Sequence, residues 1–388
     1  MAIRKSVLAM LAGALLTTAA TAADNEVKVG LILSLSGPGA VLGQEMKRGT
    51  DLALEQLGGK LGGMKTEFIY EDDQQKPEIG MQAAGRLVRS EKVNFVVGSS
   101  YSNVMMAIHG PVTKSKTFLL SPNPAPAPFA GADCNPYYFA TPFQNDQPAE
   151  AIGKYMSDQG IKNVYIMAPN YQGGRDFVNG FKRNFKGQIL GEVFTPLNQT
   201  DFSAELTALR AANPDAVFAA YPGGLGVQFI KQFDQAGLKK IPVYSAFTVN
   251  GAVLPAMGES ALGVKSASHW AVNLDNPGNK RFVQGFEKKY NAIPSEFAAQ
   301  AYDVIMMIDG ALRKTGGKLD EESLRKALQS ADFESVRGKF TFNENNHPIE
   351  NFYLLNVSKD SQGRLVQISE GVIAENMADI YAKDCKAK

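Results

Sequence analysis

LSLSGPGAVLGQEMKRGTDLALEQLGG, residues 33–59, decides the fold, because an apolar run ends there at a Gly-Pro turn and a helical pattern begins. The overlapping stretch VKVGLILSL predicts a buried strand. From residue 44 to residue 57 the apolar residues recur on one helical face, and two glycines then end the pattern. The stretch therefore predicts one strand-loop-helix unit of an α/β fold.

The loop SGPGAVLG between this strand and helix is rich in glycine, as are many loops that hold phosphate. Its glycines, Gly37, Gly39 and Gly43, fit neither the phosphate-loop pattern, which ends in Gly-Lys-Ser/Thr, nor the dinucleotide pattern G-x-G-x-x-G. We therefore expect the loop to hold no phosphate and instead to line a ligand cleft, to which it contributes Leu42.

The same alternation of strand and helix continues along the chain. It restarts after the hinge-like segment FATPFQNDQP, residues 139–148. The later strands are expected at 65–72, 93–98, 117–121, 163–169, 187–194, 215–221 and 241–247, and the helices at 77–90, 103–116, 174–184, 202–212, 226–236, 280–290, 296–314 and 321–329. Strands separated by helices predict parallel sheets with right-handed crossovers, here as two doubly wound Rossmann-like lobes. The tail beyond residue 337 reads as two strands, GKFTFN and NFYLLNV, and an irregular end.

The first residues, MAIRKSVLAMLAGALLTTAATAAD, are typical of a secretory signal peptide. Cleavage after Ala22 or Ala23 would remove Arg4 and Lys5, which leaves 38 basic residues against 39 acidic ones. A nearly neutral chain without a basic block argues against nucleic acid or an anionic membrane as partner. Export also places the two cysteines, Cys134 and Cys385, in an oxidising compartment, which favours one disulfide over two unpaired thiols.

Polar residues gather in the loop GSSYSNV, at the start of the helix expected at 103–116. Ser100, Tyr101 and Ser102 bring hydroxyls and backbone N–H groups to a helix start, an arrangement that favours a carboxylate. The alternative is ordinary N-capping by Ser102 or Asn103. The loop SPNPAPAPF is either a rigid rim of the site or a stiff connector, and EDDQQKP is interpreted as a solvated acidic turn that caps a helix.

The second half of the chain offers the loops NYQGGRDF, YPGG and SAFTVNG, whose aromatic residues face either a ligand or the core. For catalysis the sequence offers little, because it contains no G-x-S-x-G, H-E-x-x-H or C-x-x-C motif and its three histidines are scattered. We expect no enzymatic activity, no metal and no cofactor.

With the export signal and the order of the elements, these loops resemble those of the type I periplasmic solute-binding proteins of ABC transporters, in the branch of the leucine/isoleucine/valine-binding protein. The resemblance extends over nearly all of the mature chain, through stretches such as VVGSSYSN, FLLSPNPA and DAVFAAYPGG. It implies three segments that cross between the lobes, near 140–145, 266–270 and 339–343. It also implies hinge closure around a ligand, docking of the closed form on a membrane permease, and a carboxylate held at Ser102.

Departures from the family pattern concern the amino group of an amino-acid ligand. The positions that match its threonine and carboxylate partners are Ala125 and Ala246, and a buried ammonium without an acceptor is costly. Leu42 and Gly173 stand where relatives often have tyrosines. The resemblance therefore implies a pocket for a carboxylate, without an ammonium partner, and apolar enough for a ring.

We therefore predict a periplasmic, monomeric binding protein that delivers an aromatic acid of benzoate or phenylpropanoid type to an ABC importer. A branched-chain or other amino acid is the first alternative ligand, and a sensory role is the second alternative. The predicted parts are a signal peptide at 1–23, one lobe from 24–141 with 270–339, and another from 142–269 with 340–388. Arg175 is interpreted either as a ligand contact or as a solvated helix residue. The predicted ligand-binding residues are Leu42, Ser100, Tyr101, Ser102, Asn123, Ala125, Gly173, Arg175, Tyr221, Phe247 and Phe297.

Overall fold

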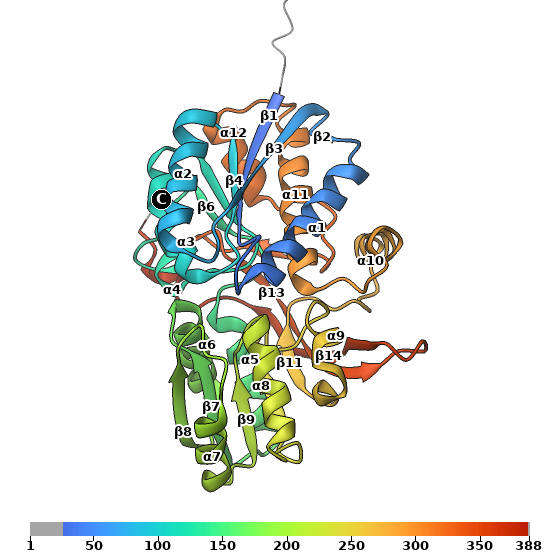
Figure 1. Cartoon of the computed structure of the whole chain (residues 1–388). Helices are drawn as coiled ribbons and strands as arrows, with labels where there is room; N and C mark the ends of the chain where they lie inside the picture. Colours follow the sequence, from blue (N-terminus) through green and yellow to red (C-terminus); the bar gives the residue numbers. More distant parts are fainter. Residues whose placement is uncertain (1–25, 387–388) are drawn as a thin grey trace, which may run out of the picture.

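The computed structural model describes residues 26–386, which form two α/β lobes that are each built on a separate sheet (Figure 1). The predicted signal peptide, residues 1–23, lies outside the described residues. Within residues 26–386, the structure contains no helix with the length and apolar character needed to cross a membrane. The two-lobed, doubly wound arrangement predicted from the sequence is confirmed.

The first lobe contains a six-stranded sheet in the order β2-β3-β1-β4-β5-β6, parallel except for the β2-β3 pair. Its strands are β1 Glu26–Leu33, β2 Lys60–Leu61, β3 Met64–Asp72, β4 Phe95–Gly98, β5 Phe118–Ser121 and β6 Tyr138–Ala140. Its helices are α1 Ala40–Gln56, α2 Pro77–Arg86 with the π-helical turn η1 Leu87–Glu91, α3 Ser102–Lys114, α4 Ala127–Ala130, α10 Pro277–Tyr290, α11 Glu296–Lys314 and α12 Glu321–Gln329.

The second lobe contains the sheet β12-β13-β11-β10-β9-β7-β8, with β14 paired to β13. Its strands are β7 Asn163–Pro169, β8 Gln188–Thr195, β9 Ala216–Ala219, β10 Val243–Ser245, β11 Lys265–Ser268, β12 Thr341–Phe342, β13 Pro348–Lys359 and β14 Leu365–Met377. Its helices are α5 Asp146–Asp158, α6 Gln172–Asn184, α7 Ser203–Ala212, α8 Gly224–Gln235 and α9 Leu254–Met257, which the 3₁₀ turn η2 Gly258–Ala261 follows. The chain's last described helical turn is η3 Ala382–Asp384.

Close packing of α1 against α11 explains why residue 49, within the stretch 33–59, is a glycine. A Cβ on Gly49 would lie 2.1 Å from the carbonyl oxygen of Ala298, so only glycine allows the two helices to approach this closely. Apolar residues of β1, α1 and α11 are buried together in one core. The amphipathic helix predicted at 44–57 is therefore confirmed, although it begins four residues earlier, at Ala40.

Three segments connect the lobes: between β6 and α5, between β11 and α10, and between α12 and β12. Arg337 in the third segment donates through Nη1 to the carbonyl oxygen of Pro142 (2.8 Å) and through Nη2 to that of Thr141, both in the first segment. The same guanidinium pairs with Glu350 on β13 (2.8 Å) and lies 3.6 Å from Asp303 on α11. This buried arginine thus joins the crossing segments to both lobes.

Two expectations about the elements are wrong. The stretch 146–158 is helix α5, although no helix was expected there. Its polar residues recur every four positions, at Asp146, Glu150, Lys154 and Asp158, which is a helical pattern. The end of the chain, expected to be irregular, contains the strand β14, which pairs with β13 through several register shifts. A half-exposed strand with irregular pairing gives no regular alternation of apolar and polar residues.

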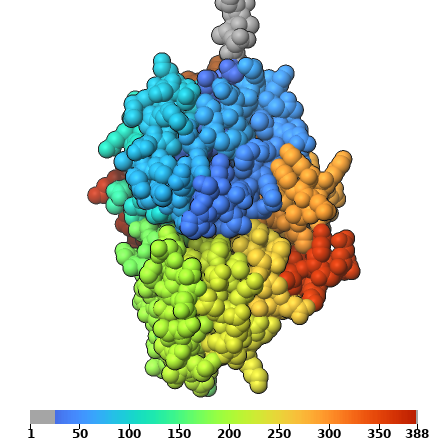
Figure 2. Space-filling view, viewed as in Figure 1, coloured from blue at the N-terminus to red at the C-terminus, as the bar shows by residue number. Residues whose placement is uncertain are grey.

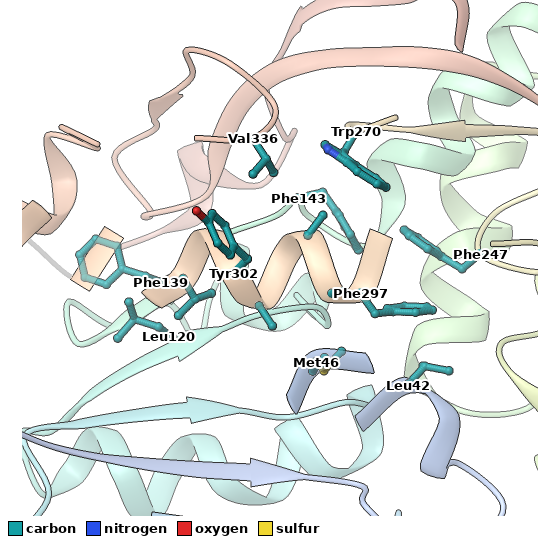
Figure 3. Packing of buried hydrophobic residues seen from close by; sticks show 14 of the residues in the cluster. Leu42, Met46, Leu120, Phe139, Phe143, Phe247, Trp270, Phe297, Tyr302 and Val336 are labelled. Atoms are coloured by element: carbon teal, nitrogen blue, oxygen red, sulfur yellow. The ribbon is translucent and has the colours of Figure 1, made fainter. Parts of the chain in front are cut away.

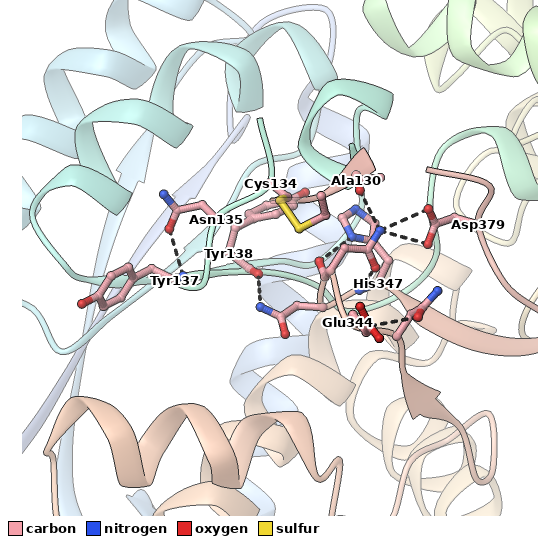
Figure 4. Close-up of a disulfide and its surroundings, with 12 residues drawn as sticks. Ala130, Cys134, Asn135, Tyr137, Tyr138, Glu344, His347 and Asp379 are labelled. Carbon is pink, nitrogen blue, oxygen red and sulfur yellow. Dashed lines mark hydrogen bonds between the residues drawn. A yellow bond between two sulfur atoms is a disulfide. The ribbon is translucent and has the colours of Figure 1, made fainter. Parts of the chain in front are cut away.

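A disulfide joins Cys134 to Cys385, as predicted, with the Cα atoms 5.5 Å apart (Figure 4). It attaches the C-terminal segment to the loop that precedes β6. The same segment also reaches the second lobe, because the Tyr381 hydroxyl donates to Asp146 at the start of α5 (2.7 Å). Near the disulfide, Asn345 donates to both carboxylate oxygens of Asp379 (3.1 Å each). The tail therefore contacts both lobes.

Candidate functional site

Parallel register brings the loops after β1, β4 and β5 to one edge of the first sheet. Ile32 pairs with Gly98, and Val97 pairs with Leu120, so the following loops lie side by side. This edge faces the loops that follow β7, β9 and β10 of the second lobe, where ligands of open α/β sheets bind. The two lobes touch along their boundary (Figure 2), and a small cavity with about 20 Å³ of space lies between them.

One wall of the cavity is aromatic. The ring of Phe247 stacks on Phe143, with centroids 4.9 Å apart, and packs against Phe177 at 5.5 Å and Phe297 at 6.2 Å. Figure 3 shows Phe143, Phe247 and Phe297 close together beside Leu42. Phe247 also has a backbone φ of 61°, a value that non-glycine residues rarely adopt and that occurs often at ligand sites. The predicted apolar wall of Leu42, Phe247 and Phe297 therefore lines the cavity.

The start of α3 forms the polar end of the cavity. Tyr101 is the N-cap residue and its side chain makes no capping hydrogen bond, so the alternative of capping by Ser102 or Asn103 is wrong. Asn103 instead donates to the carbonyl oxygen of Gln75 (3.1 Å). The N–H groups of the first turn and the Ser102 hydroxyl are donors that an anion can use, and the helix dipole favours negative charge there.

Other polar residues of the lining have structural partners. The Ser100 hydroxyl accepts from the backbone N–H of Ser34 (3.1 Å), and Asn123 donates to the carbonyl oxygen of Ser100 (2.9 Å). Ser100 and Asn123, both predicted as ligand contacts, thus line the cavity and also connect the loops around it. Tyr101 is buried and Tyr171 half-buried in the lining, and loss of water around the two phenols raises their pKa, so both stay neutral at physiological pH.

Four predicted site residues lie outside the lining. Ala125 is buried behind it, where its N–H donates to Asn145 (2.8 Å). Gly173 lies close behind, since a Cβ there would be 2.8 Å from both the Ser102 Oγ and the Tyr171 hydroxyl. Arg175 is exposed and donates to Asn170, as expected for a solvated helix residue. Tyr221 is fully buried against Phe202 and Phe229 and accepts from Thr195 (3.2 Å), so it packs in the second lobe.

Two polar residues at this end of the cavity, Asn145 and Asp176, were not predicted from the sequence. Asn145 Nδ2 donates to Ser102 Oγ (3.3 Å) and to Asp176 Oδ2 (2.8 Å). Asp176 on α6 also accepts from Gln172 through Oδ1 (2.8 Å). Burial raises the pKa of Asp176 to about 7. The polar run QND between β6 and α5 was the sign of this contact in the sequence.

The acidic turn EDDQQKP is not the solvated helix cap expected from the sequence. Asp73 is fully buried and accepts from the Ser34 hydroxyl (2.5 Å), while Asp72 accepts from the backbone N–H of Leu35 (2.9 Å). Helix α2 begins after Lys76 without a side-chain cap. The two carboxylates thus fix the loop that follows β1, and Leu42 lies just after this loop in the first turn of α1. Among the described residues, no group of three or more His, Cys, Asp or Glu side chains is placed to hold a metal ion.

No charged side chain lines the cavity in the described part of the chain. Ala246, the position of the family's carboxylate, is buried and presents no acceptor of that kind. The site therefore combines a helix start, neutral hydroxyl and amide groups, and an aromatic wall. Such an arrangement can bind a small anion with a flat apolar body, but it offers no carboxylate to a buried ammonium.

Comparisons with known proteins agree with this geometry. The family described as periplasmic binding protein matches residues 26–363. A curated relative, the Leu/Ile/Val-binding protein homolog 6 of Brucella melitensis, is 31% identical over 369 residues, which is 92% of this chain and 94% of the relative.

Two solved structures are also similar over most of their length. The solute-binding protein of an ABC transporter from R. palustris, in complex with benzoate, is 32% identical with a TM-score of 0.88, and the match covers 93% of this chain and 99% of that one. A solute-binding protein from Rhodopseudomonas palustris BisB5, in complex with 3,4-dihydroxybenzoic acid, is 30% identical with a TM-score of 0.86, covering 92% and 99%.

Proposed function

Because the chain belongs to the periplasmic binding protein family, we propose that it binds a small aromatic carboxylate between its lobes. It then delivers this acid to the permease of an ABC importer. Proteins of this kind bind small-molecule ligands and work with ABC permeases. The proposal places the protein in the periplasm as a monomer without enzymatic activity.

One observation carries the choice of ligand: the cavity combines the anion-binding start of α3 with an aromatic wall, and no acidic side chain lines it. Burial of a ring against such a wall contributes about 1.5–3 kcal/mol. An ammonium group without an acceptor costs at least as much. The two terms together favour an aromatic acid over an amino acid by about a hundredfold or more.

The cavity is small in this state of the protein. Its space is about 20 Å³, room for about one water molecule, so a ring can enter only after the lobes part, and the lining rather than the volume supports the choice of ligand. The relatives in complex with benzoate and 3,4-dihydroxybenzoic acid support the same class.

The second candidate ligand is a branched-chain amino acid, because the curated relative is named for leucine, isoleucine and valine. The apolar wall would accept such side chains. The α-ammonium group argues against them, since no carboxylate is among the described residues that line the cavity.

A ligand panel tests the proposal. Melting curves and calorimetry are measured with benzoate, hydroxybenzoates, cinnamate, leucine, isoleucine and valine. A true ligand at about 100 times its Kd stabilises the fold by about 2.7 kcal/mol. Leucine or valine binding more tightly than every aromatic acid would refute the proposal.

A variant pair tests the role of the carboxylate. Ser102→Ala removes a hydrogen bond to a charged group, worth about 1.5–3 kcal/mol, and should weaken benzoate binding about 10- to 100-fold. Ser115→Ala, at the other end of α3, is the matched control and should leave the Kd unchanged. Equal Kd values for wild type and Ser102→Ala would contradict this role for Ser102.

A further inference from the structure

Asn145 connects the polar end of the cavity to both lobes. Its Oδ1 accepts from the backbone N–H of Ala125 (2.8 Å), and its own N–H donates to the carbonyl oxygen of Ala125 (3.0 Å). Because Oδ1 is turned to Ala125, Nδ2 faces Ser102 and Asp176. Ser102 Oγ accepts the bond from Asn145, so its own proton is left for a ligand oxygen.

Asp176 stands behind this pair and comes from the second lobe. Its Oδ2 accepts from Asn145 in the first crossing segment and from the backbone N–H of Ala127 in the first lobe (3.3 Å). Only 2% of the residue is exposed. Of these contacts, the one with Ala127 joins α6 to the first lobe and exists only when the lobes are in contact. The bond to Asn145 joins α6 to the first crossing segment.

We propose that Asp176 is a positioning residue that carries a proton when the lobes are closed around the ligand, so that carboxylate binding takes up one proton from the solvent. The inference rests on the proposed function, because the ligand carboxylate brings a negative charge to the Ser102 end of the same hydrogen-bond chain. Two carboxylates joined through one Asn145 amide disfavour each other's ionised form.

The surroundings of Asp176 supply no cation that would hold it ionised. Arg183 pairs with Asp146 (2.9 Å) and with Glu150. Arg175 is exposed and bonded to Asn170. Loss of water around the buried group raises its pKa to about 7, and the negative charge of Asp146 adds to this. Two titratable or charged groups near Asp176 lie at the start of α6, Tyr171 and Arg175. The others are Asp146 at the start of α5 and its partners Arg183 and Tyr381.

A protonated Asp176 keeps the network intact. Oδ2 still accepts from Asn145 and Ala127, as in the structure. Oδ1 then carries the proton and donates it to the amide oxygen of Gln172, once that amide group turns over. The proton comes from the solvent during closure and returns to it on opening. No bond in the ligand changes.

The pH dependence follows from the difference between the open and closed states. In the closed state burial raises the pKa of Asp176 to about 7, and loss of the Ala127 contact on opening should lower it. Between the pKa values of the two states, closure requires proton uptake, so the Kd rises by up to about tenfold for each unit of pH. Above about pH 7 the Kd levels off, because the carboxyl group is then ionised in both states.

Calorimetry with benzoate from pH 5 to 8.5, in buffers of different ionisation enthalpy, tests the proposal. Wild type should take up close to one proton near pH 6. Asp176→Asn keeps the hydrogen bonds without the titration and should take up none, with a Kd that does not change with pH. Asp158→Asn, an exposed carboxylate on α5, is the charge-matched control and should behave as wild type.

Each outcome supports or overturns the proposal. Tight binding of benzoate by wild type without proton uptake overturns this inference alone. The same holds if Asp176→Asn retains the pH slope of wild type. If Asp176→Asn fails to fold, the proton count of wild type decides. Failure of every aromatic carboxylate to bind at any pH overturns the proposed function and this inference together.

Discussion

Replacement of Gly173 by alanine should weaken ligand binding without loss of stability. Gly173 is the second residue of α6, and a Cβ there would lie 2.8 Å from both Ser102 Oγ and the Tyr171 hydroxyl. Both atoms are at the ends of side chains that can move by a few tenths of an ångström. The fold therefore accommodates the methyl group, but the donors at the polar end of the cavity are displaced.

The two expected effects have opposite signs. Alanine in place of glycine in a helix stabilises a protein by about 0.4–1 kcal/mol, because the unfolded chain loses fewer conformations. The displaced Ser102 hydroxyl weakens a hydrogen bond to a charged group, which is worth about 1.5–3 kcal/mol when intact. Loss of half or more of that energy raises the Kd about tenfold.

Urea denaturation of the ligand-free protein and calorimetry with benzoate measure the two effects separately. Gly110→Ala is the matched control, because Gly110 lies in α3 and an added Cβ there meets no atom within 4 Å. It should leave the Kd unchanged, while its gain in stability should be smaller, because a Cβ before Pro111 disfavours the helical backbone. If Gly173→Ala binds benzoate as tightly as wild type, or if Gly110→Ala weakens binding equally, the reasoning is wrong.

Other expected outcomes concern the fold and its closure. Reduction of the Cys134–Cys385 bond should lower the free energy of unfolding by about 2–4 kcal/mol, and an unchanged urea midpoint would contradict this. Arg337→Met should destabilise the fold by about 3–5 kcal/mol, since Glu350 loses its buried partner; a urea midpoint equal to that of wild type would argue against such a loss. Saturation with a bound aromatic acid should reduce the radius of gyration measured by X-ray scattering, and identical profiles with and without ligand would speak against hinge closure.

The order of the elements could be predicted from the sequence because it depends on local patterns. The apolar run before Ser34 and the periodic stretch after it each specify their element without reference to the rest of the chain. Helix α5 was not predicted because its first residues belong to the segment FATPFQNDQP, which was interpreted as a hinge. Its polar residues Asp146 and Glu150 follow the helical period, but they are buried against Arg183 of α6 rather than exposed to water.

In the candidate site too, some residues could be predicted from local patterns and others depend on tertiary packing. Ser102 and Phe247 lie where strands end, and the strand order places such positions in the cleft. Tyr221 occupies a similar position, but its side chain points into the second lobe, and its neighbour Pro222 lines the cavity instead. For Arg175 the helical period was informative, because Gly173 and Asp176 are three residues apart on the buried face and Arg175 falls outside it.

The lack of charged residues in the lining and the proposed protonation of Asp176 have the same cause: excess negative charge is unfavourable in the closed cleft. The described lining has no cation, so a bound carboxylate is balanced only by the start of α3, equivalent to roughly half a positive charge, and by neutral donors. A second ionised carboxylate at Asp176 would leave about one and a half negative charges uncompensated in a dry space, where water screens them weakly. An anion therefore binds more tightly when Asp176 is neutral on closure than when it is ionised. Because no cation is among the described residues that line the cavity, affinity should depend on pH far more than on salt.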